Sequence, residues 1–103
     1  MITVLVIDRN RTRLATAAAL LARCGYCALS ARDDAEALNL LTQMPIQAVL
    51  AQVVPTEPAH AALVETIRAR FPQVAVAALR EPYSVAALIH AIGRCLHDER
   101  VAA

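Results

Sequence analysis

The sequence predicts an α/β fold: an open parallel sheet of about four strands with helices on both faces. Three observations indicate it. Short apolar runs, such as residues 3–7 and 48–51, have no alternating polar residues, which is typical of strands buried on both faces. Longer segments between these runs repeat apolar residues at helical spacing. Strand and helix then alternate along the whole chain, as they do in parallel α/β sheets.

Composition and charge narrow the class of protein. The 103 residues suffice for one domain, residues 1–103, with a single core. Apolar residues make up 58% of the chain and aromatic ones only 3%, so the core must consist of Ala, Leu, Val and Ile. A net charge of +1 predicts no direct binding to nucleic acid or to an anionic membrane. Because no apolar stretch has membrane-spanning length, and the opening run is too short for a signal peptide, we expect a cytoplasmic protein.

The first strand covers Thr3–Ile7 and stops at polar residues that begin with Asp8. Asn10 is a suitable N-cap for a helix over residues 11–23, which is rich in Ala and Leu. Gly25 ends this helix at the position that follows the C-cap.

The second strand is expected over residues 26–30. Asp33 then caps a second helix, with Glu36 three residues further on in the arrangement of a capping box. This helix ends before Pro45.

A third strand over residues 48–51 is followed by a helix that begins near Pro58 and runs to about Phe71. Residues 74–79 form a fourth strand that is apolar throughout, and Ser84 caps the last helix. The inward stripe expected for this helix is Val85, Leu88, Ile89, Ile92 and Leu96. Together these elements predict a flavodoxin-like sheet with the strand order 2-1-3-4.

Three stretches resemble the receiver domain of bacterial response regulators. Residues 4–8 resemble its first strand and first acid, residues 25–38 its second strand and the start of its second helix, and residues 45–55 its third strand with the flanking prolines. The resemblance covers roughly the first half of the chain well and is partial after Phe71.

The resemblance implies five functional positions, of which this sequence retains one. Receivers phosphorylate an aspartate after the third strand, bind Mg²⁺ with it and two further acids, and contact the phosphoryl group through Thr or Ser and a Lys. Asp8 stands at the first acid. Arg9 stands at the second acid and Ala51 at the phosphate acceptor. Arg80 stands at the Thr or Ser position and Glu81 at the Lys position. We therefore expect no catalysis, no bound metal and no cofactor, with Asp8 paired to Arg9 or bonded to the turn backbone.

The chain is also shorter than the family it resembles, which has five strands and five helices. Only a few residues separate Leu79 from Ser84, so the fourth helix and fifth strand of that family have no counterpart. The last helix should then lie on the same face of the sheet as the first. The fourth strand becomes an edge without Lys, Pro, a bulge or an inward charge.

An unprotected edge predicts a homodimer. The expected dimer-edge residues are Val74, Val76, Ala77 and Leu79. Either the two fourth strands pair antiparallel around a two-fold axis, or the last helix is exchanged across it. The alternative is a monomer whose last helix covers the edge.

Other groups of residues suggest different chemistry. Cys24 and Cys27 match C-x-x-C, but reactive thiols of that motif lie at a helix N-terminus, whereas Cys24 is expected at a C-terminus. The three histidines, His60, His90 and His97, lack neighbouring ligands and are expected at the surface. A basic rim could contact an anion or an acidic partner, and it consists of Arg9, Arg11, Arg13 and Arg80.

The leading hypothesis is a non-catalytic, phosphorylation-independent pseudo-receiver. It would serve as a protein-interaction or dimerisation module in bacterial signalling or transcription control, either free-standing or joined to a downstream effector domain. The alternative is a small thiol-redox or anion-binding protein that uses Cys24 and Cys27, or Arg9 and Arg80.

Overall fold

The computed structural model describes residues 2–53, 57–80 and 84–102, with the backbone alone for Val85 and residues 95–102. The strands are β1 (Thr3–Ile7), β2 (Cys27–Ala31), β3 (Ala48–Val53) and β4 (Ala75–Arg80). The helices are α1 (Arg11–Arg23), α2 (Asp34–Gln43), α3 (Pro58–Arg70) and α4 (Val85–Ala102). The strands form one parallel sheet in the order β2-β1-β3-β4, which confirms the predicted fold class and strand order. Strands β2 and β4 each begin one residue later than predicted.

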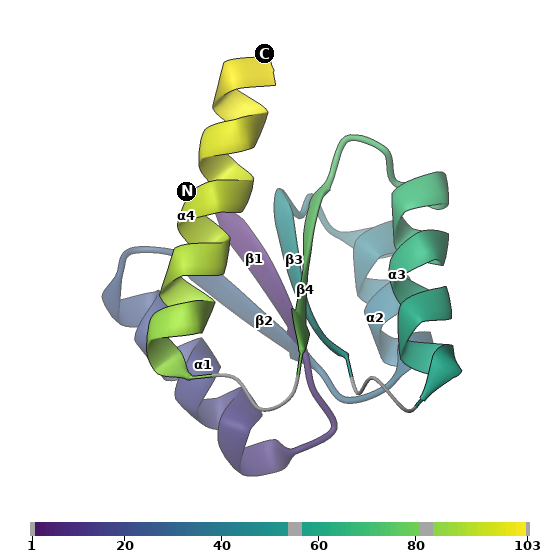
Figure 1. The fold of residues 1–103 in the computed structure, drawn as a ribbon, viewed down its shortest axis with the longest axis horizontal. Coiled ribbons are helices and arrows are strands. Elements are labelled where there is room, and N and C mark those ends of the chain that lie inside the picture. The colour runs from purple at the N-terminus through teal and green to yellow at the C-terminus, as the bar shows by residue number, and fades with distance from the viewer. Residues whose placement is uncertain (1, 54–56, 81–83, 103) are drawn as a thin grey trace.

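Helices cover both faces of the sheet, in pairs (Figure 1). On one face α2 and α3 pack against a core that includes Leu5, Val49 and Ile67. On the other face Leu88 of α4 shares a core with Leu21 of α1. The last helix therefore lies on the face of the first helix, as predicted.

Local signals in the sequence place the helix ends. The side chains of Asn10 and Asp33 accept hydrogen bonds from the backbone N–H groups of Arg13 and Glu36, at 3.0 and 2.8 Å. Gly25 follows the last turn of α1 with a φ of +91°, a left-handed conformation that favours glycine. The predicted caps are thus confirmed, and they fix where α1 and α2 begin and where α1 ends.

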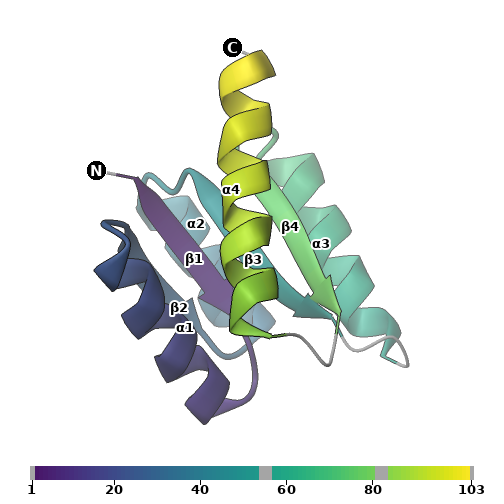
Figure 2. The same ribbon diagram turned by 60° about the vertical axis from the view of Figure 1, so that its left-hand side comes forward.

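The edge strand β4 is less buried than its apolar sequence suggested. The N-terminal half of the strand is partly exposed and Ala78 is exposed, because only β3 pairs with this strand in the described structure. Figure 2 shows β4 at the outer side of the sheet, with α4 in front and α3 behind. β4 is therefore the edge strand that the sequence predicted.

Two further side chains differ from expectation. Ile89 is 42% exposed, because the neighbouring stripe of Leu88 and Ile92 already faces the sheet and a step of one residue turns about 100° round the helix. His60 is 6% exposed rather than at the surface, since it lies in the first turn of α3 beside Gln52 of β3 and Asp8. His90 is exposed as predicted, and the side chain of His97 lies outside the described residues.

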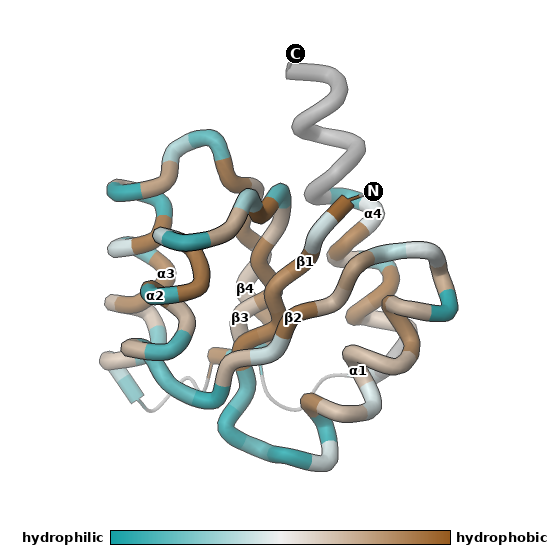
Figure 3. The backbone as a smooth tube through the Cα atoms, turned by 180° about the vertical axis from the view of Figure 1, so that it is seen from behind, coloured by the Kyte–Doolittle hydropathy of each residue, from teal (hydrophilic) through white to brown (hydrophobic). Residues whose placement is uncertain are grey.

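Hydropathy follows the architecture. Figure 3 shows the hydrophobic residues concentrated along the strands, and hydrophilic residues in the loop that joins β1 to α1. Across the residues described, the structure contains no helix with the length and apolar character needed to cross a membrane.

Candidate functional site

The candidate site lies at the carboxyl end of β1, where Asp8 is the first residue beyond the strand. Its side chain is completely buried. Two backbone contacts hold the residue: its N–H donates to the carbonyl of Ala31 in β2 at 3.1 Å, and its Oδ1 accepts from the N–H of Asn10 at 2.8 Å. Asp8 is therefore fixed in position by the sheet on one side and by the start of α1 on the other.

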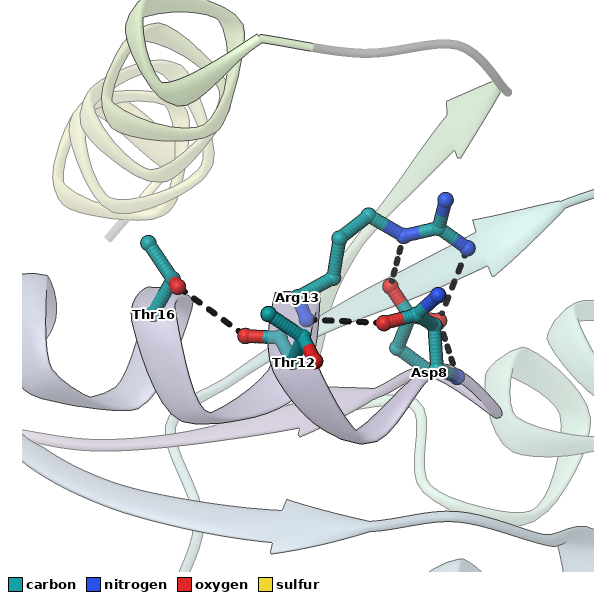
Figure 4. A network of polar contacts seen from close by, with 5 residues as sticks. Asp8, Thr12, Arg13 and Thr16 are labelled. Carbon is teal, nitrogen blue, oxygen red and sulfur yellow. Dashed lines mark hydrogen bonds and ion pairs between the residues drawn. The ribbon is translucent and has the colours of Figure 1, made fainter.

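Arg13 supplies the positive charge that this buried carboxylate requires. Its Nε donates to Oδ2 of Asp8 at 2.8 Å and its Nη2 donates to Oδ1 at 3.1 Å, so the guanidinium binds both oxygens (Figure 4). Two-pronged contacts of this kind are the strongest that arginine makes with a carboxylate. Of the two contacts predicted for Asp8, the bond to the turn backbone is present, through the N–H of Asn10. The ion pair forms with Arg13 and not with Arg9, because Arg13, in the first turn of α1, points back at the strand end.

The second acid position does not restore a metal site. Arg9 is exposed and its Nη1 lies 3.3 Å from Oε2 of Glu57. The same oxygen lies 3.3 Å from Nε2 of His60. Among the residues described, no group of three or more acidic, histidine or cysteine side chains could hold a metal ion. The oxygens of Asp8 are occupied by a guanidinium instead.

The acceptor position is an apolar residue in the core. Ala51 is 1% exposed and packs with the residues beneath α2 and α3. Gln52, the next residue, is buried and lines a pocket with Asp8 and His60. The volume of that pocket is about 10 Å³, which is about the space of one water molecule. The amide of Gln52 does not supply the carboxylate nucleophile that forms an acyl phosphate.

Of the predicted basic rim, Arg13 binds Asp8 and Arg9 lies beside it. Arg9 lines the small pocket beside Asp8, together with Arg32. Arg80 ends β4, and β3 separates that strand from β1. Arg11 is exposed in the first turn of α1. Glu81, the position that resembles the receiver lysine with its charge reversed, lies outside the described residues.

The two cysteines of the C-x-x-C motif are free thiols. Cys24 is the C-cap residue of α1, as predicted, and Cys27 is the first residue of β2. The backbone N–H groups of Cys24, Gly25 and Tyr26 all donate to carbonyls in the last turns of α1. None of these three donors is directed at a sulfur.

Sequence reasoning did not identify three contributors to this edge: Arg13 as the partner of Asp8, and Glu57 and His60 as a pair beside Arg9. One signal for Arg13 was available. An arginine three residues after a helix N-cap, close behind a buried acid, can reach back to the strand end. No comparable signal marks His60, whose burial depends on how α3 lies over β3.

Comparisons with known proteins agree on the fold. No protein-family profile matches the sequence, and no curated protein matches it. A receiver domain protein (CheY-like) from Methanospirillum hungatei superposes with a TM-score of 0.86 at 15% identity, over 100% of this chain and 99% of that chain. A response regulator from Thermotoga maritima has a TM-score of 0.73 at 25% identity, over 90% of this chain and 77% of that one. NtrX from Brucella abortus, solved with ADP, has a TM-score of 0.84 at 17% identity, and the match covers 99% of this chain but 29% of NtrX.

Proposed function

Because this chain has the fold of response-regulator receiver domains, we propose that it is a non-catalytic, phosphorylation-independent protein-interaction module in bacterial signalling or transcription control. The observation that carries the proposal is the Asp8–Arg13 pair. It occupies the carboxylate that would otherwise hold a metal, in a chain whose acceptor position is Ala51. The surface of the domain is then the part that can act, by binding another protein.

The wild-type protein is expected not to become phosphorylated when it is incubated with acetyl phosphate or phosphoramidate and Mg²⁺. The acceptor position lacks a carboxylate, and the remaining acid is paired to Arg13. Intact-mass spectrometry measures this directly, with a receiver domain that retains its aspartate as the positive control. Covalent phosphate on any aspartate of this chain would contradict the proposal.

The interaction that we propose is a homodimer formed through the outer edge of β4. The N–H of Ala75 donates to the carbonyl of Gln47, at 3.1 Å, and so faces β3. In a parallel pair, successive residues turn their backbone groups alternately to the two sides of the strand. Ala77 and Leu79 therefore also face β3, whereas Val76, Ala78 and Arg80 turn their N–H and C=O groups outward.

This register revises the expected edge residues. Val74 precedes β4, and its N–H is used by the carbonyl of Phe71 at 3.0 Å. Of the four residues predicted for the edge, only Val76 carries outward backbone groups. The exposed Ala78 provides the central ones, because it lies between Val76 and Arg80.

The wild type is expected to associate into dimers at micromolar concentration, whereas Ala78→Pro is expected to be monomeric. Proline removes the outward N–H at the centre of the edge without removing a bond to β3. Size-exclusion chromatography with light scattering over a concentration series measures both. A wild type that is monomeric throughout would contradict the wild-type dimer, and an Ala78→Pro variant that still dimerises would contradict the β4 interface.

We further propose that residues 1–103 form one receiver-like domain, which is cytoplasmic and binds neither nucleic acid nor membrane directly. The match to NtrX, which spans 29% of that protein, supports the possibility that such a domain is joined to an effector domain. The complete reading frame distinguishes a free-standing adaptor from the first domain of a longer regulator.

A further inference from the structure

One side chain crosses from α3 to the open edge of the sheet. Nη2 of Arg68 donates to the backbone carbonyl of Val76, at 3.5 Å. The other end of the guanidinium lies 3.5 Å from Oε1 of Glu65, one turn earlier in α3, and the Arg68 side chain is 51% exposed. The carbonyl of Val76 is one of the outward groups of β4. Arg68 thus covers part of the edge that the sequence alone suggested was unprotected.

A second arginine lies on the same face of β4. Side chains alternate along a strand, and Val76 packs with the core beneath α2 and α3, while Ala75, Ala77 and Leu79 pack beneath α1 and α4. Ala78 and Arg80 therefore project on the side of Val76 and Arg68. The open stretch of edge, centred on Ala78, has a positive charge at each end and no acidic side chain among the described residues of β4.

These charges oppose self-pairing. Two copies of β4 can pair antiparallel around a two-fold axis at Val76, Ala77 or Ala78, because the edge is regular over these residues. An axis at Ala77 or Ala78 brings Arg80 of one copy beside Arg68 of the other, and an axis at Val76 brings the two copies of Arg68 together. In each case Arg68 must also release the carbonyl of Val76. Like charges placed opposite each other on a sheet are destabilising.

We propose that Arg68 weakens pairing at the outer edge of β4 and so sets the affinity with which a second copy of this chain binds to that edge. The inference rests on the proposed dimer and concerns its regulation. Removing the guanidinium frees the Val76 carbonyl and removes one of the repelling charges, so the dimer tightens. Salt screens the repulsion between the arginines, so the wild-type dimer also tightens as ionic strength rises.

The test compares dimer dissociation constants from sedimentation equilibrium for the wild type, Arg68→Ala and Arg68→Glu, with Arg23→Ala as the control. Arg23 is an exposed arginine in the last turn of α1, on the other face of the sheet. We expect Arg68→Ala to lower the dissociation constant about tenfold, an effect summed over the two symmetry-related copies of Arg68, each of which frees its Val76 carbonyl and loses its repelling charge. Arg68→Glu should lower it further if the axis lies at Ala77 or Ala78, where the new carboxylate can pair with Arg80 of the other copy, but not if it lies at Val76, where two carboxylates would meet. Arg23→Ala should leave it unchanged.

The possible outcomes test the role of Arg68 separately from the existence of the dimer. If the wild type dimerises and both Arg68 variants have the same dissociation constant as the wild type, the proposed role of Arg68 is wrong and the proposed dimer is supported. If neither the wild type nor the Arg68 variants dimerise, both ideas are wrong. If the wild type is monomeric and Arg68→Ala is dimeric, the proposed role of Arg68 is supported and the proposal that the wild type dimerises is wrong. Adding Ala78→Pro to Arg68→Ala must abolish the gain, or the association does not involve β4. Circular dichroism confirms that each variant is folded.

Discussion

Replacing Arg13 with methionine is expected to lower the free energy of unfolding by about 2–3 kcal/mol. The variant leaves the buried carboxylate of Asp8 without its guanidinium. Removing one member of a buried ion pair costs roughly 3–5 kcal/mol in general. A smaller value is expected here because the Arg13 side chain is 33% exposed and the N–H of Asn10 still bonds to Asp8. Methionine keeps most of the volume of the arginine stem, so the loss of stability reflects the missing charge pair and not a loss of packing.

Urea denaturation measures this loss, and two further variants show its origin. Asp8→Asn combined with Arg13→Met should be less destabilised than the sum of the two single variants, because the double variant has no unpaired buried charge. Arg11→Met, which alters an exposed arginine two residues earlier in the same helix, should have little effect. If Arg13→Met is as stable as Arg11→Met, the pair does not neutralise Asp8 as its geometry indicates.

Proline substitutions at neighbouring positions of β4 should have very different effects on stability. Ala77→Pro is expected to cost about 3 kcal/mol, because it removes an N–H that faces β3 and places the ring against that strand. Ala78→Pro is expected to cost about 1 kcal/mol or less, because its N–H faces away from the sheet. The contrast follows from the single register that pairs Ala77 with Leu50 and Ala78 with Ala51.

Thermal unfolding of the two proline variants, measured at a concentration where both are monomeric, distinguishes the two positions. Ala77→Val and Ala78→Val serve as controls for the added side-chain carbons, since neither removes an N–H. Equal destabilisation by the two prolines, or a larger effect at Ala78, would show that the backbone of β4 is turned the other way. The outward groups assigned to the dimer edge would then be wrong as well.

The elements of this fold were predictable because each depends on neighbouring residues in sequence. The apolar run at Thr3–Ile7, the cap at Asn10 and the glycine at position 25 each act within one turn or one strand. The pairing at the site was not predictable in the same way. Arginines at positions 9, 11 and 13 are all close to Asp8 in sequence, and only the direction of the first turn of α1 selects Arg13.

The edge of β4 shows a second limit of the same kind. Its composition correctly placed a strand there, but which backbone groups face outward depends on its register with β3. The contact of Arg68 with Val76 joins a helix to a strand through side-chain reach, which no periodicity encodes. Likewise His60 and Glu57 meet near Arg9 only because α3 begins above the end of β3.

The internal neutralisation of Asp8 by Arg13 also affects what kind of signal such a domain can report. If the proposed loss of phosphorylation holds, the site has no second covalent state, and an incoming stimulus cannot be stored as a modification there. If the proposed β4 dimer forms, its occupancy follows mass action, and it changes most steeply when the copy number of the protein is near the dissociation constant. Synthesis and degradation of the chain would then set its output, and the residue that tunes the threshold would be Arg68.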